Sequence, residues 1–222
     1  MKIYSIIVAG GSGTRMKQSI PKQFLLLNGR PILMHTIERF EALSDEIIVV
    51  LPKNEMQTWK SLCEKFNFSI SIKLIDGGKE RFYSVQNAIE SIEDSEGIVL
   101  VHDGVRPLLS EKLIQHIIDQ TQKGLLVIPV YDIQESIRKQ ENNQNKMVDR
   151  RLYKTVQTPQ GFHLSKIKKA YQQDYRSEFT DDASVLESIG ETITLIEGER
   201  FNLKITTPED LMLAELLINA WT

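Results

Sequence analysis

With 222 residues, the chain is long enough to bury a full hydrophobic core, and its length favours one domain spanning residues 1–222. Its 27 basic and 30 acidic residues are mixed along the sequence and leave a formal charge of -3, so bulk nucleic-acid binding is disfavoured and any anion site must be small. No run of about 18 apolar residues occurs and the first residues read as a strand, so we expect neither membrane insertion nor secretion, and a cytoplasmic location.

Short apolar runs alternate along the chain with segments of helical length. This alternation predicts βαβ crossovers, and therefore an α/β fold in which a mostly parallel, doubly wound (Rossmann-like) sheet is the middle of three layers. In such a sheet, ligands bind beyond the carboxyl ends of the strands. The strands are expected at 3–8, 47–51, 71–75, 97–101 and 124–130, and the helices between them at 32–42, 55–66, 83–92 and 111–121.

A glycine-rich loop follows the first predicted strand and is the most informative segment of the chain. It reads A-G-G-S-G-T-R-M at 9–16, and P-K-Q-F follows at 21–24. Glycines allow main-chain N–H groups to approach an anion, and Arg15 and Lys22 add two cations, so the segment predicts a cradle for a polyphosphate. The alternative is that the glycines only form a tight turn between a strand and a helix. These glycines are Gly10, Gly11 and Gly13.

The loop differs from two better-known nucleotide-binding loops. No Lys-Ser or Lys-Thr pair follows the glycines, so the pattern G-x-x-x-x-G-K-[ST] is absent. Met16 stands where the dinucleotide pattern G-x-G-x-x-G requires its third glycine. The loop therefore indicates a nucleotide-handling enzyme of another type.

Two further turns follow predicted strands and are expected at the same edge of the sheet. The turn D-G-G-K at 76–79 opens a helix with Arg81 and Ser84 on its first turns, and its backbone can read a pyrimidine edge. Asp103 ends the next strand region and is a suitable ligand for Mg²⁺ held jointly with phosphates, while Arg106 matches a phosphate bidentately. The alternatives are an ordinary turn with solvated charges at 76–79, and an aspartate at 103 that only forms a turn or caps a helix.

The regular alternation stops at about 131–155. This stretch predicts a protruding β-hairpin, the β-arm, whose tip is the polar segment 140–146. Because a two-stranded ribbon is marginal alone in water, we expect the β-arm to pack against a second copy of the chain and form a homodimer. After 158–160 the sequence predicts a helix, a strand and a final helix that begins at Pro208.

The order of these motifs resembles the bacterial 2-C-methyl-D-erythritol 4-phosphate cytidylyltransferases, from residue 3 to about residue 217. The resemblance implies a sheet of the nucleotidyltransferase type, and transfer of CMP from CTP to the methylerythritol phosphate with Mg²⁺, releasing pyrophosphate, in non-mevalonate isoprenoid synthesis. The product is 4-diphosphocytidyl-2-C-methyl-D-erythritol. The shared motifs are those at 9–16 and 21–24, D-G-G-K-E-R at 76–81, H-D-G-V-R-P at 102–107, V-D-R at 148–150, T-P-Q at 158–160, T-D-D-A-S at 180–184 and N-L-K-I-T-T-P-E-D at 202–210.

The resemblance also implies roles for individual residues. Lys79 departs from the family pattern, since an acidic residue is frequent there, and Ser136 replaces a frequent threonine. The Lys79 substitution leaves a main-chain contact to the base possible, and Ser136 keeps a hydroxyl. The residues implied to stabilise the transition state are Arg15 and Lys22, and those around the cytidine are Ala9, Gly10, Gly78 and Ser84, with Asp103 on the metal side. The residues implied to hold the acceptor phosphate are Arg106, Ser136, Arg150, Thr158 and Lys204. We also count Lys204 as catalytic.

The residues fit the physical demands of the reaction that the resemblance implies. A phosphate must attack the α-phosphorus of a triphosphate, one anion approaching another, so the enzyme has to position the groups and neutralise charge. Two alternatives remain. The nearest is a ribitol-5-phosphate cytidylyltransferase, which shares the glycine loop, P-K-Q and the aspartate; the other is a regulatory nucleotide-binding module on the same fold.

Overall fold

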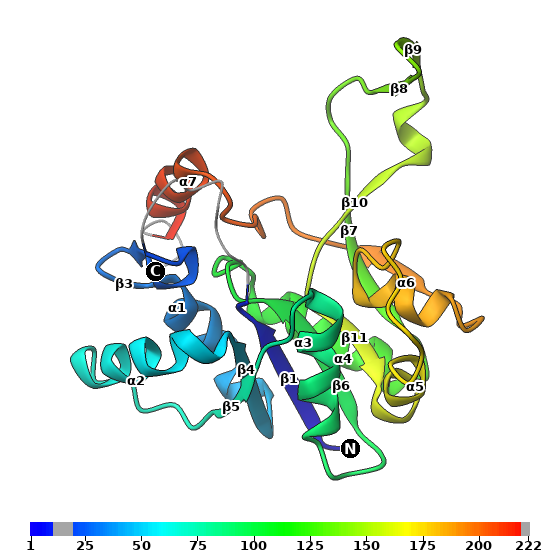
Figure 1. Ribbon diagram of the computed structural model, residues 1–222. Helices are drawn as coiled ribbons and strands as arrows, with labels where there is room; N and C mark the ends of the chain where they lie inside the picture. The colour runs from blue at the N-terminus through cyan, green and yellow to red at the C-terminus, as the bar shows by residue number, and fades with distance from the viewer. Residues whose placement is uncertain (11–19, 219–222) are drawn as a thin grey trace.

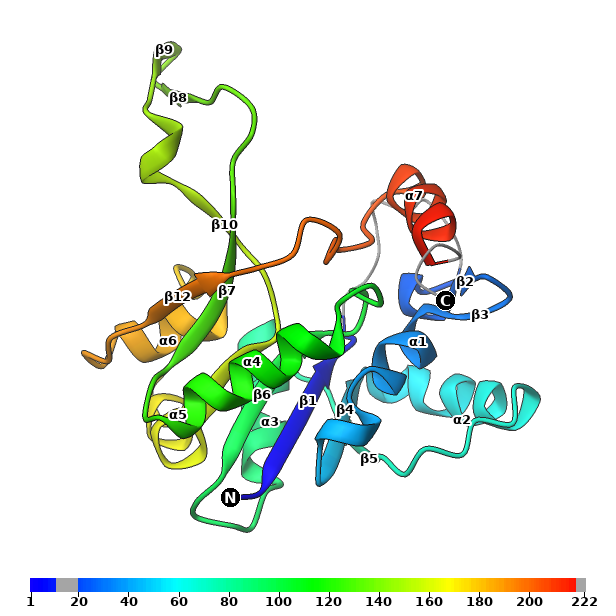
Figure 2. The ribbon, with the colours of Figure 1, turned by 180° about the vertical axis from the view of Figure 1, so that it is seen from behind.

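The computed structural model of the protein describes residues 1–10 and 20–218. Within these residues, eight strands form one sheet in the order β10-β7-β11-β6-β1-β4-β5, and β12 joins it by pairing with β7. Helices cover both faces, which confirms the predicted three-layer α/β fold (Figures 1 and 2). The strands are β1 (Ile3–Val8), β4 (Glu46–Leu51), β5 (Lys73–Asp76), β6 (Ile98–Asp103), β7 (Val127–Asp132), β10 (Lys154–Val156), β11 (Gln160–His163) and β12 (Thr194–Glu197).

The order and direction of the strands place the functional loops together. Strands β5, β4, β1 and β6 are parallel neighbours, so their carboxyl ends meet at one edge of the sheet. Val8 at the end of β1 is level with Val50 on one side and Asp103 on the other. The chain runs from β1 outward to β4 and β5 and then returns to β6 on the opposite side of β1. The topological switch point, where such sheets bind ligands, therefore lies between β1 and β6.

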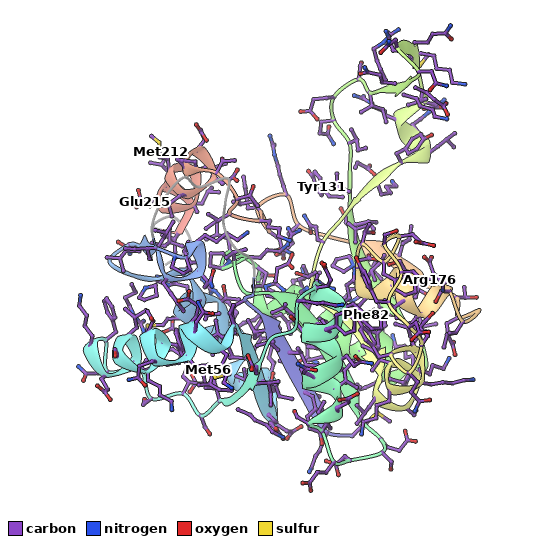
Figure 3. The ribbon with its side chains drawn as sticks, in the orientation of Figure 1. Met56, Phe82, Tyr131, Arg176, Met212 and Glu215 are labelled. Atoms are coloured by element: carbon purple, nitrogen blue, oxygen red, sulfur yellow. The ribbon has the colours of Figure 1, made fainter. Side chains whose placement is uncertain are left out.

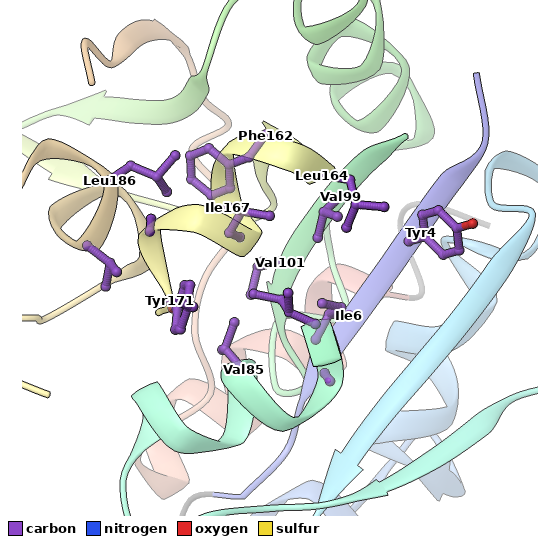
Figure 4. Close-up of a cluster of buried hydrophobic side chains, with 14 of the residues drawn as sticks. Tyr4, Ile6, Val85, Val99, Val101, Phe162, Leu164, Ile167, Tyr171 and Leu186 are labelled. Carbon is purple, nitrogen blue, oxygen red and sulfur yellow. The ribbon is translucent and has the colours of Figure 1, made fainter. Parts of the chain in front are cut away.

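Alternate side chains of the strands fill two hydrophobic cores, one on each face of the sheet. Ile6 and Val101 point into the core beneath α3, α5 and α6, which Figure 4 shows in close-up. Ile7 and Leu100 point to the opposite core, beneath α1, α2 and α4. The helices are α1 (Ile32–Glu38), α2 (Met56–Lys65), α3 (Arg81–Glu90), α4 (Glu111–Gln122), α5 (Leu164–Ala170), α6 (Asp182–Glu187) and α7 (Pro208–Ile218), with short 3-10 turns η2 (Lys22–Phe24), η3 (Glu41–Leu43), η4 (Lys53–Glu55) and η5 (Arg150–Leu152).

Most predicted elements are present, with changed ends. The helix expected at 32–42 stops at Glu38 and is followed by the turn η3, and the strand expected at 97–101 continues to Asp103. This longer strand places Asp103 within the sheet, where it is paired with Val8 at the end of β1. The final helix begins at Pro208 as predicted.

Strand β11 is the main correction to the sequence prediction. A helix was expected after 158–160, but the chain first forms β11, antiparallel to both β6 and β7. The strand has four residues and includes Gly161, so the sequence shows no apolar run of strand length. A Cβ at Gly161 would lie 2.5 Å from Cγ2 of Ile117 and 2.6 Å from Oγ1 of Thr121. The glycine is thus a site of close approach between the sheet and α4.

The β-arm predicted at about 131–155 projects from the body of the molecule (Figures 1 and 2). Its outer part is the hairpin of β8 (Arg138–Glu141) and β9 (Gln144–Met147), and every residue of both strands is exposed. Asn142 and Asn143 make the turn with positive φ angles of 49° and 61°. Asparagine tolerates this left-handed conformation better than most residues, which is why the polar tip can turn tightly.

The last helix, α7, packs in a small third cluster that also includes Leu27 of β2 (Leu26–Leu27), the strand that pairs with β3 (Arg30–Pro31). Ala214 and Ile218 are its buried residues, while Met212, labelled in Figure 3, is exposed. In the part of the chain that the structure describes, no helix is long and apolar enough to cross a membrane.

Candidate active site

Three loops at the carboxyl edge of the sheet are tied to neighbouring strands by main-chain hydrogen bonds. The N–H of Ala9 donates to the carbonyl of Val50 at 2.9 Å, and the N–H of Gly104 donates to the carbonyl of Val8 at 2.9 Å. The N–H of Gly77 donates to the carbonyl of Leu51, also at 2.9 Å. The three segments singled out in the sequence therefore open on one place.

A cavity of about 340 Å³ lies between these loops. This volume is within the range of small-molecule sites, which is about 300–1,000 Å³. The lining contains eight of the residues expected from the sequence: Ala9, Gly10, Lys22, Gly78, Arg81, Ser84, Asp103 and Lys204. It also contains Lys79, for which the sequence left a main-chain contact to the base possible, and Val8, Gln23, Glu80 and Val105, which the sequence did not assign to the site. Gly11, Gly13 and Arg15 lie outside the described residues.

The glycine turn at 77–78 is shaped by its own helix. The hydroxyl of Ser84 accepts a hydrogen bond from the N–H of Gly78 at 3.1 Å and donates to the carbonyl of Glu80 at 3.1 Å. A Cβ at Gly78 would lie 2.3 Å from Cβ of Tyr83, so no larger residue fits without a shift of the turn. A Cβ at Gly10 would lie 3.8 Å from Oγ of Ser84, so Gly10 lies close to the first turn of the helix that follows the glycine turn.

Asp103 is the buried carboxylate of the cavity. Its Oδ2 accepts a hydrogen bond from Nε of Arg106 at 3.0 Å and lies 3.1 Å from Nζ of Lys204. Burial alone would raise the pKa of this carboxyl, but the charges of Lys204, Arg81 and Arg106 outweigh burial and hold the pKa well below its usual range. Asp103 is therefore a carboxylate at neutral pH, surrounded by cations that suit phosphate ligands.

His102 and Thr158 form a hydrogen-bonded group next to Asp103. The N–H of Asp103 donates to Oγ1 of Thr158 at 3.1 Å, and this oxygen is 3.0 Å from Nδ1 of His102. Nε2 of His102 lies 3.1 Å from the carbonyl of Arg106. Burial lowers the pKa of His102 to about 3, so the ring is neutral at pH 7. Because the carbonyl of Arg106 only accepts, we assign the ring proton to Nε2 and the accepting role to Nδ1.

Thr158, one of the expected acceptor-binding residues, is buried, with 6% of its surface exposed. Its carbonyl accepts a hydrogen bond from Nδ2 of Asn202 at 2.7 Å, and the carbonyl of Asn202 accepts from Arg106 at 2.7 Å. These contacts join the loop of Asp103 to the segment that carries Lys204.

The β-arm residues Ser136 and Arg150 do not line the cavity of their own chain. Both are exposed, and Arg150 donates a hydrogen bond to the carbonyl of Gln134 within the arm. Arg150 lines a separate hollow of about 240 Å³ at the base of the arm, with Asp132, Arg151 and others. Within the described residues, one chain therefore brings together the side chains and turns expected to bind nucleotide and metal, but it leaves these two expected acceptor residues apart.

The chemistry of the donors is compatible with Mg²⁺ only if a ligand supplies further oxygens. Among the described residues, no three His, Cys, Asp or Glu side chains are grouped to hold a metal. Asp103 supplies a hard carboxylate oxygen, and Mg²⁺ is usually bound by one or two carboxylates together with substrate phosphates. The site thus suits a metal that arrives with a triphosphate.

Comparison with known proteins gives a consistent result. The family model of IspD, 2-C-methyl-D-erythritol 4-phosphate cytidylyltransferase, matches residues 3–220. The chain is 47% identical over 220 residues to the 2-C-methyl-D-erythritol 4-phosphate cytidylyltransferase of Phocaeicola vulgatus, covering 98% of this chain and 100% of the relative. It is 49% identical over 220 residues to the protein of the same name from Azobacteroides pseudotrichonymphae, covering 97% and 98%.

Solved structures agree at the level of the fold and the family. The crystal structure of 4-diphosphocytidyl-2C-methyl-D-erythritol synthase from Anaerococcus prevotii superposes with a TM-score of 0.82 at 28% identity, covering 98% of both chains. The 2-C-methyl-D-erythritol 4-phosphate cytidylyltransferase from Thermus thermophilus superposes with a TM-score of 0.81 at 28% identity, covering 99% of this chain and 100% of the other.

Proposed function

The chain belongs to the 2-C-methyl-D-erythritol 4-phosphate cytidylyltransferase family, and from this premise we propose that it transfers CMP from CTP to 2-C-methyl-D-erythritol 4-phosphate. The products are 4-diphosphocytidyl-2-C-methyl-D-erythritol and pyrophosphate. The observation that carries the proposal is the cavity at the switch point, where Lys22, Asp103 and Lys204 lie together with Gly10 and Gly78. The names of the relatives favour the methylerythritol phosphate over ribitol 5-phosphate as the acceptor.

The reaction needs no covalent intermediate on the protein. An oxygen of the acceptor phosphate attacks the α-phosphorus of CTP, and the bond from that phosphorus to the oxygen that bridges to the β-phosphorus breaks. The departing pyrophosphate carries the electron pair of that bond. Lys22, with Arg15, neutralises the charge that develops on the α-phosphate and on the leaving group, and this is the role expected of preorganised cations.

Asp103 is the residue that would hold Mg²⁺, and Mg²⁺ bound there with the triphosphate would neutralise and orient the phosphate oxygens. Arg106 and Lys204 both contact Oδ2 of Asp103, so they stand beside the place where phosphates would gather. Lys204 is 40% exposed at its side chain and can turn from Asp103 toward the phosphate of the acceptor. Arg106 is less exposed, at 11%, and keeps its place through the carbonyl of Asn202.

The cytosine would lie between the two glycine loops. Ala9 and Gly10 line one wall, and Gly78 and Ser84 line the other. Because Ser84 holds the turn of Gly78 in shape, main-chain groups of that turn can present fixed donors and acceptors to the edge of the base.

We also assign the β-arm to a homodimer. Its exposed apolar residues would be buried against a second copy, and the exposed Ser136 and Arg150 would reach the acceptor phosphate in the partner's cavity. This arrangement explains why a two-stranded ribbon with no core of its own extends from the domain. The exposed apolar residues are Met147, Leu152, Tyr153 and Val156.

A turnover assay tests the proposed function directly. Pyrophosphate release is measured with CTP, Mg²⁺ and either 2-C-methyl-D-erythritol 4-phosphate or ribitol 5-phosphate. We expect release with the first acceptor at a kcat/KM far above that with the second. Equal or better turnover of ribitol 5-phosphate would reject the assigned acceptor, and no release with either acceptor would reject the transferase itself.

A further inference from the structure

Arg81 is held by a residue that lies far from it in the sequence. Nη1 and Nη2 of Arg81 donate to Oδ1 and Oδ2 of Asp182 at 2.8 and 2.6 Å, a bidentate pair across 101 positions. The side chain of Asp182 is completely buried, while that of Arg81 is 29% exposed. A bidentate contact to a buried carboxylate fixes both the place and the plane of a guanidinium.

The carboxylate of Asp182 is itself fixed by its surroundings. The hydroxyl of Tyr171 donates to Oδ1 at 2.6 Å, and the Tyr171 ring stacks on Phe82 with centroids 4.7 Å apart. Figure 4 shows Tyr171 at the end of α5, between Leu186 of α6 and Val85 of α3. The side chain that anchors Arg81 is therefore part of a packed layer and is unable to follow Arg81 if the arginine moves.

The start of α6, which carries Asp182, is also anchored to the sheet. Nε2 of Gln160 on β11 donates to Oδ2 of Asp181 at 2.9 Å, and Oε1 of Gln160 accepts from the N–H of Ala183 at 3.0 Å. Asp181 caps the helix by accepting from the N–H of Ser184 at 3.0 Å. Asp182 thus occupies a position defined by β11, and β11 is a direct neighbour of the strand that ends in Asp103.

Arg81 lines the nucleotide cavity and begins α3 directly after the glycine turn. Asp182 takes two of the five N–H donors of the guanidinium, so the pair orients Arg81 without consuming its capacity to contact an anion.

We propose that Asp182 is a positioning residue for nucleotide binding: with Tyr171, it holds the guanidinium of Arg81 in the wall of the cavity that binds CTP. This inference rests on the proposed function, since it takes CTP as the ligand of the cavity. Asp182 itself is buried behind Arg81 and touches no substrate. The binding of CTP then depends on α6 through the contact between Asp182 and Arg81, and not only on the glycine turns.

A purely structural role would have a different consequence. A buried ion pair that only joins α3 to α6 would lower the stability of the fold when broken, and it would leave the affinity of the folded protein for CTP unchanged. The two roles separate when the affinities for the two substrates and the melting temperature are measured on the same variants.

The experiment compares Asp182→Asn and Tyr171→Phe with the intact enzyme. For Asp182→Asn we expect the KM for CTP, and the Kd for CTP by calorimetry, to rise about tenfold, because one charge-assisted hydrogen bond to Arg81 is lost. The KM for the acceptor should stay within about twofold, as expected when the loss is confined to nucleotide binding. Tyr171→Phe keeps the ring and the carboxylate, and we expect a smaller rise of about threefold in the Kd for CTP.

A matched control comes from the same region. Lys166 on α5 and Glu191 beyond α6 form a surface ion pair of 2.7 Å that does not line the cavity. Glu191→Gln should leave both KM values unchanged. If Asp182→Asn does not fold, Tyr171→Phe gives the decisive value, and an unchanged Kd for CTP in that folded variant would overturn the proposal.

A double-mutant cycle tests whether Asp182 acts through Arg81. Arg81→Gln alone should weaken CTP binding at least as much as Asp182→Asn, and the double variant should be no weaker than Arg81→Gln. Additive losses would show that Asp182 acts elsewhere and would overturn the proposal. Failure of the proposed function looks different, because the intact enzyme would then neither bind CTP nor release pyrophosphate.

Discussion

Lys22 and Asp103 have different roles in the proposed mechanism. Lys22 is in the short turn η2, which follows Pro21, and Asp103 is at the end of a fully buried strand. In the proposed mechanism, Lys22 neutralises charge that develops during the reaction. Asp103 is already paired with Arg106 and Lys204 before any ligand binds. Substitutions at the two positions should therefore affect different measured quantities.

Replacement of Lys22 tests the charge that it supplies to the transition state. Lys22→Ala should raise the activation free energy by about 3–4 kcal/mol, by analogy with the loss of one preorganised donor, and so lower kcat by two to three orders of magnitude. The melting temperature should stay close to that of the intact enzyme. Lys53→Ala, at an exposed lysine outside the cavity, is the control and should retain full turnover. A kcat for Lys22→Ala near that of Lys53→Ala would refute the assignment.

Replacement of Asp103 tests the metal site. Asp103→Asn keeps the shape of the side chain but removes the charge, so the concentration of Mg²⁺ that gives half-maximal turnover should rise by about tenfold or more. The measurement is a titration of turnover with Mg²⁺ at saturating CTP. An unchanged Mg²⁺ requirement would show that the metal is held without Asp103.

The neutral state of His102 predicts a pH dependence of stability. Burial lowers its pKa from 6.5 to about 3, so the unfolded chain binds a proton between these values that the folded chain does not. The free energy of unfolding should therefore fall as the pH decreases below 6.5, by up to about 1.4 kcal/mol per pH unit from this group. The charged groups that act on the ring are Asp103, Arg106 and Lys204.

The comparison is made with His102→Gln by chemical denaturation between pH 7 and pH 4.5. The variant should be less stable at pH 7, where the hydrogen bonds of the ring are lost, and its stability should depend less on pH than that of the intact protein. The other histidines are present in both proteins and cancel. Parallel stability curves for the two proteins would contradict a buried neutral His102.

At the scale of the elements, the sequence predicts those parts of the fold that local pattern determines. The strand before the glycine loop and the final helix at Pro208 have clear apolar runs and end signals, and both were predicted closely. Strand β11 was missed because it has four residues, and its burial depends on two neighbouring strands that come from other parts of the chain. Tertiary context decides such short segments.

For the candidate site too, the sequence predicts those residues that local pattern determines. The glycine loops, Asp103 and Arg81 could be named from the sequence because each follows a strand at the carboxyl edge of the sheet. The pairing of Arg81 with Asp182 could not, because it joins residues 101 positions apart whose approach depends on the packing of α6. Sequence alone also assigned no role to Gln23, although it lines the cavity beside Lys22.

The close approach of α4 and β11 gives a prediction for stability. Gly161→Ala places a methyl group within 2.6 Å of Ile117 and Thr121, so the helix or the strand must move. We expect the free energy of unfolding to fall by about 1–3 kcal/mol, as is typical of overpacking. Ser69→Ala, at an exposed position, should change it little. An equally stable Gly161→Ala variant would mean that the interface has room for the methyl group.

At the scale of the whole molecule, the β-arm is the part that a single chain leaves unexplained. Figures 1 and 2 show it extending away from the domain, and its β8 and β9 strands form a separate sheet. The proposed homodimer would bury its apolar residues and bring Arg150 to a second cavity. A complete active site would then contain residues of two chains.

Mixing of two defective enzymes tests this shared site. Lys22→Ala should lower kcat by two to three orders of magnitude, and Arg150→Ala should raise the KM for the acceptor while leaving the KM for CTP unchanged. In a refolded equal mixture, half of the dimers would carry one of each chain, and one of their two sites would be free of both changes. Turnover at low acceptor concentration should therefore recover to about a quarter of that of the intact enzyme. A mixture no more active than the average of its two components would argue against exchange of the arm.

The account as a whole depends on where CTP binds. The most direct measurement is a crystal structure of the protein with CTP and Mg²⁺. We predict the cytosine between Gly10 and the turn of Gly78, the triphosphate beside Lys22, and the metal on Asp103. A triphosphate bound away from Lys22 and Asp103 would contradict the assigned site and the mechanism built on it.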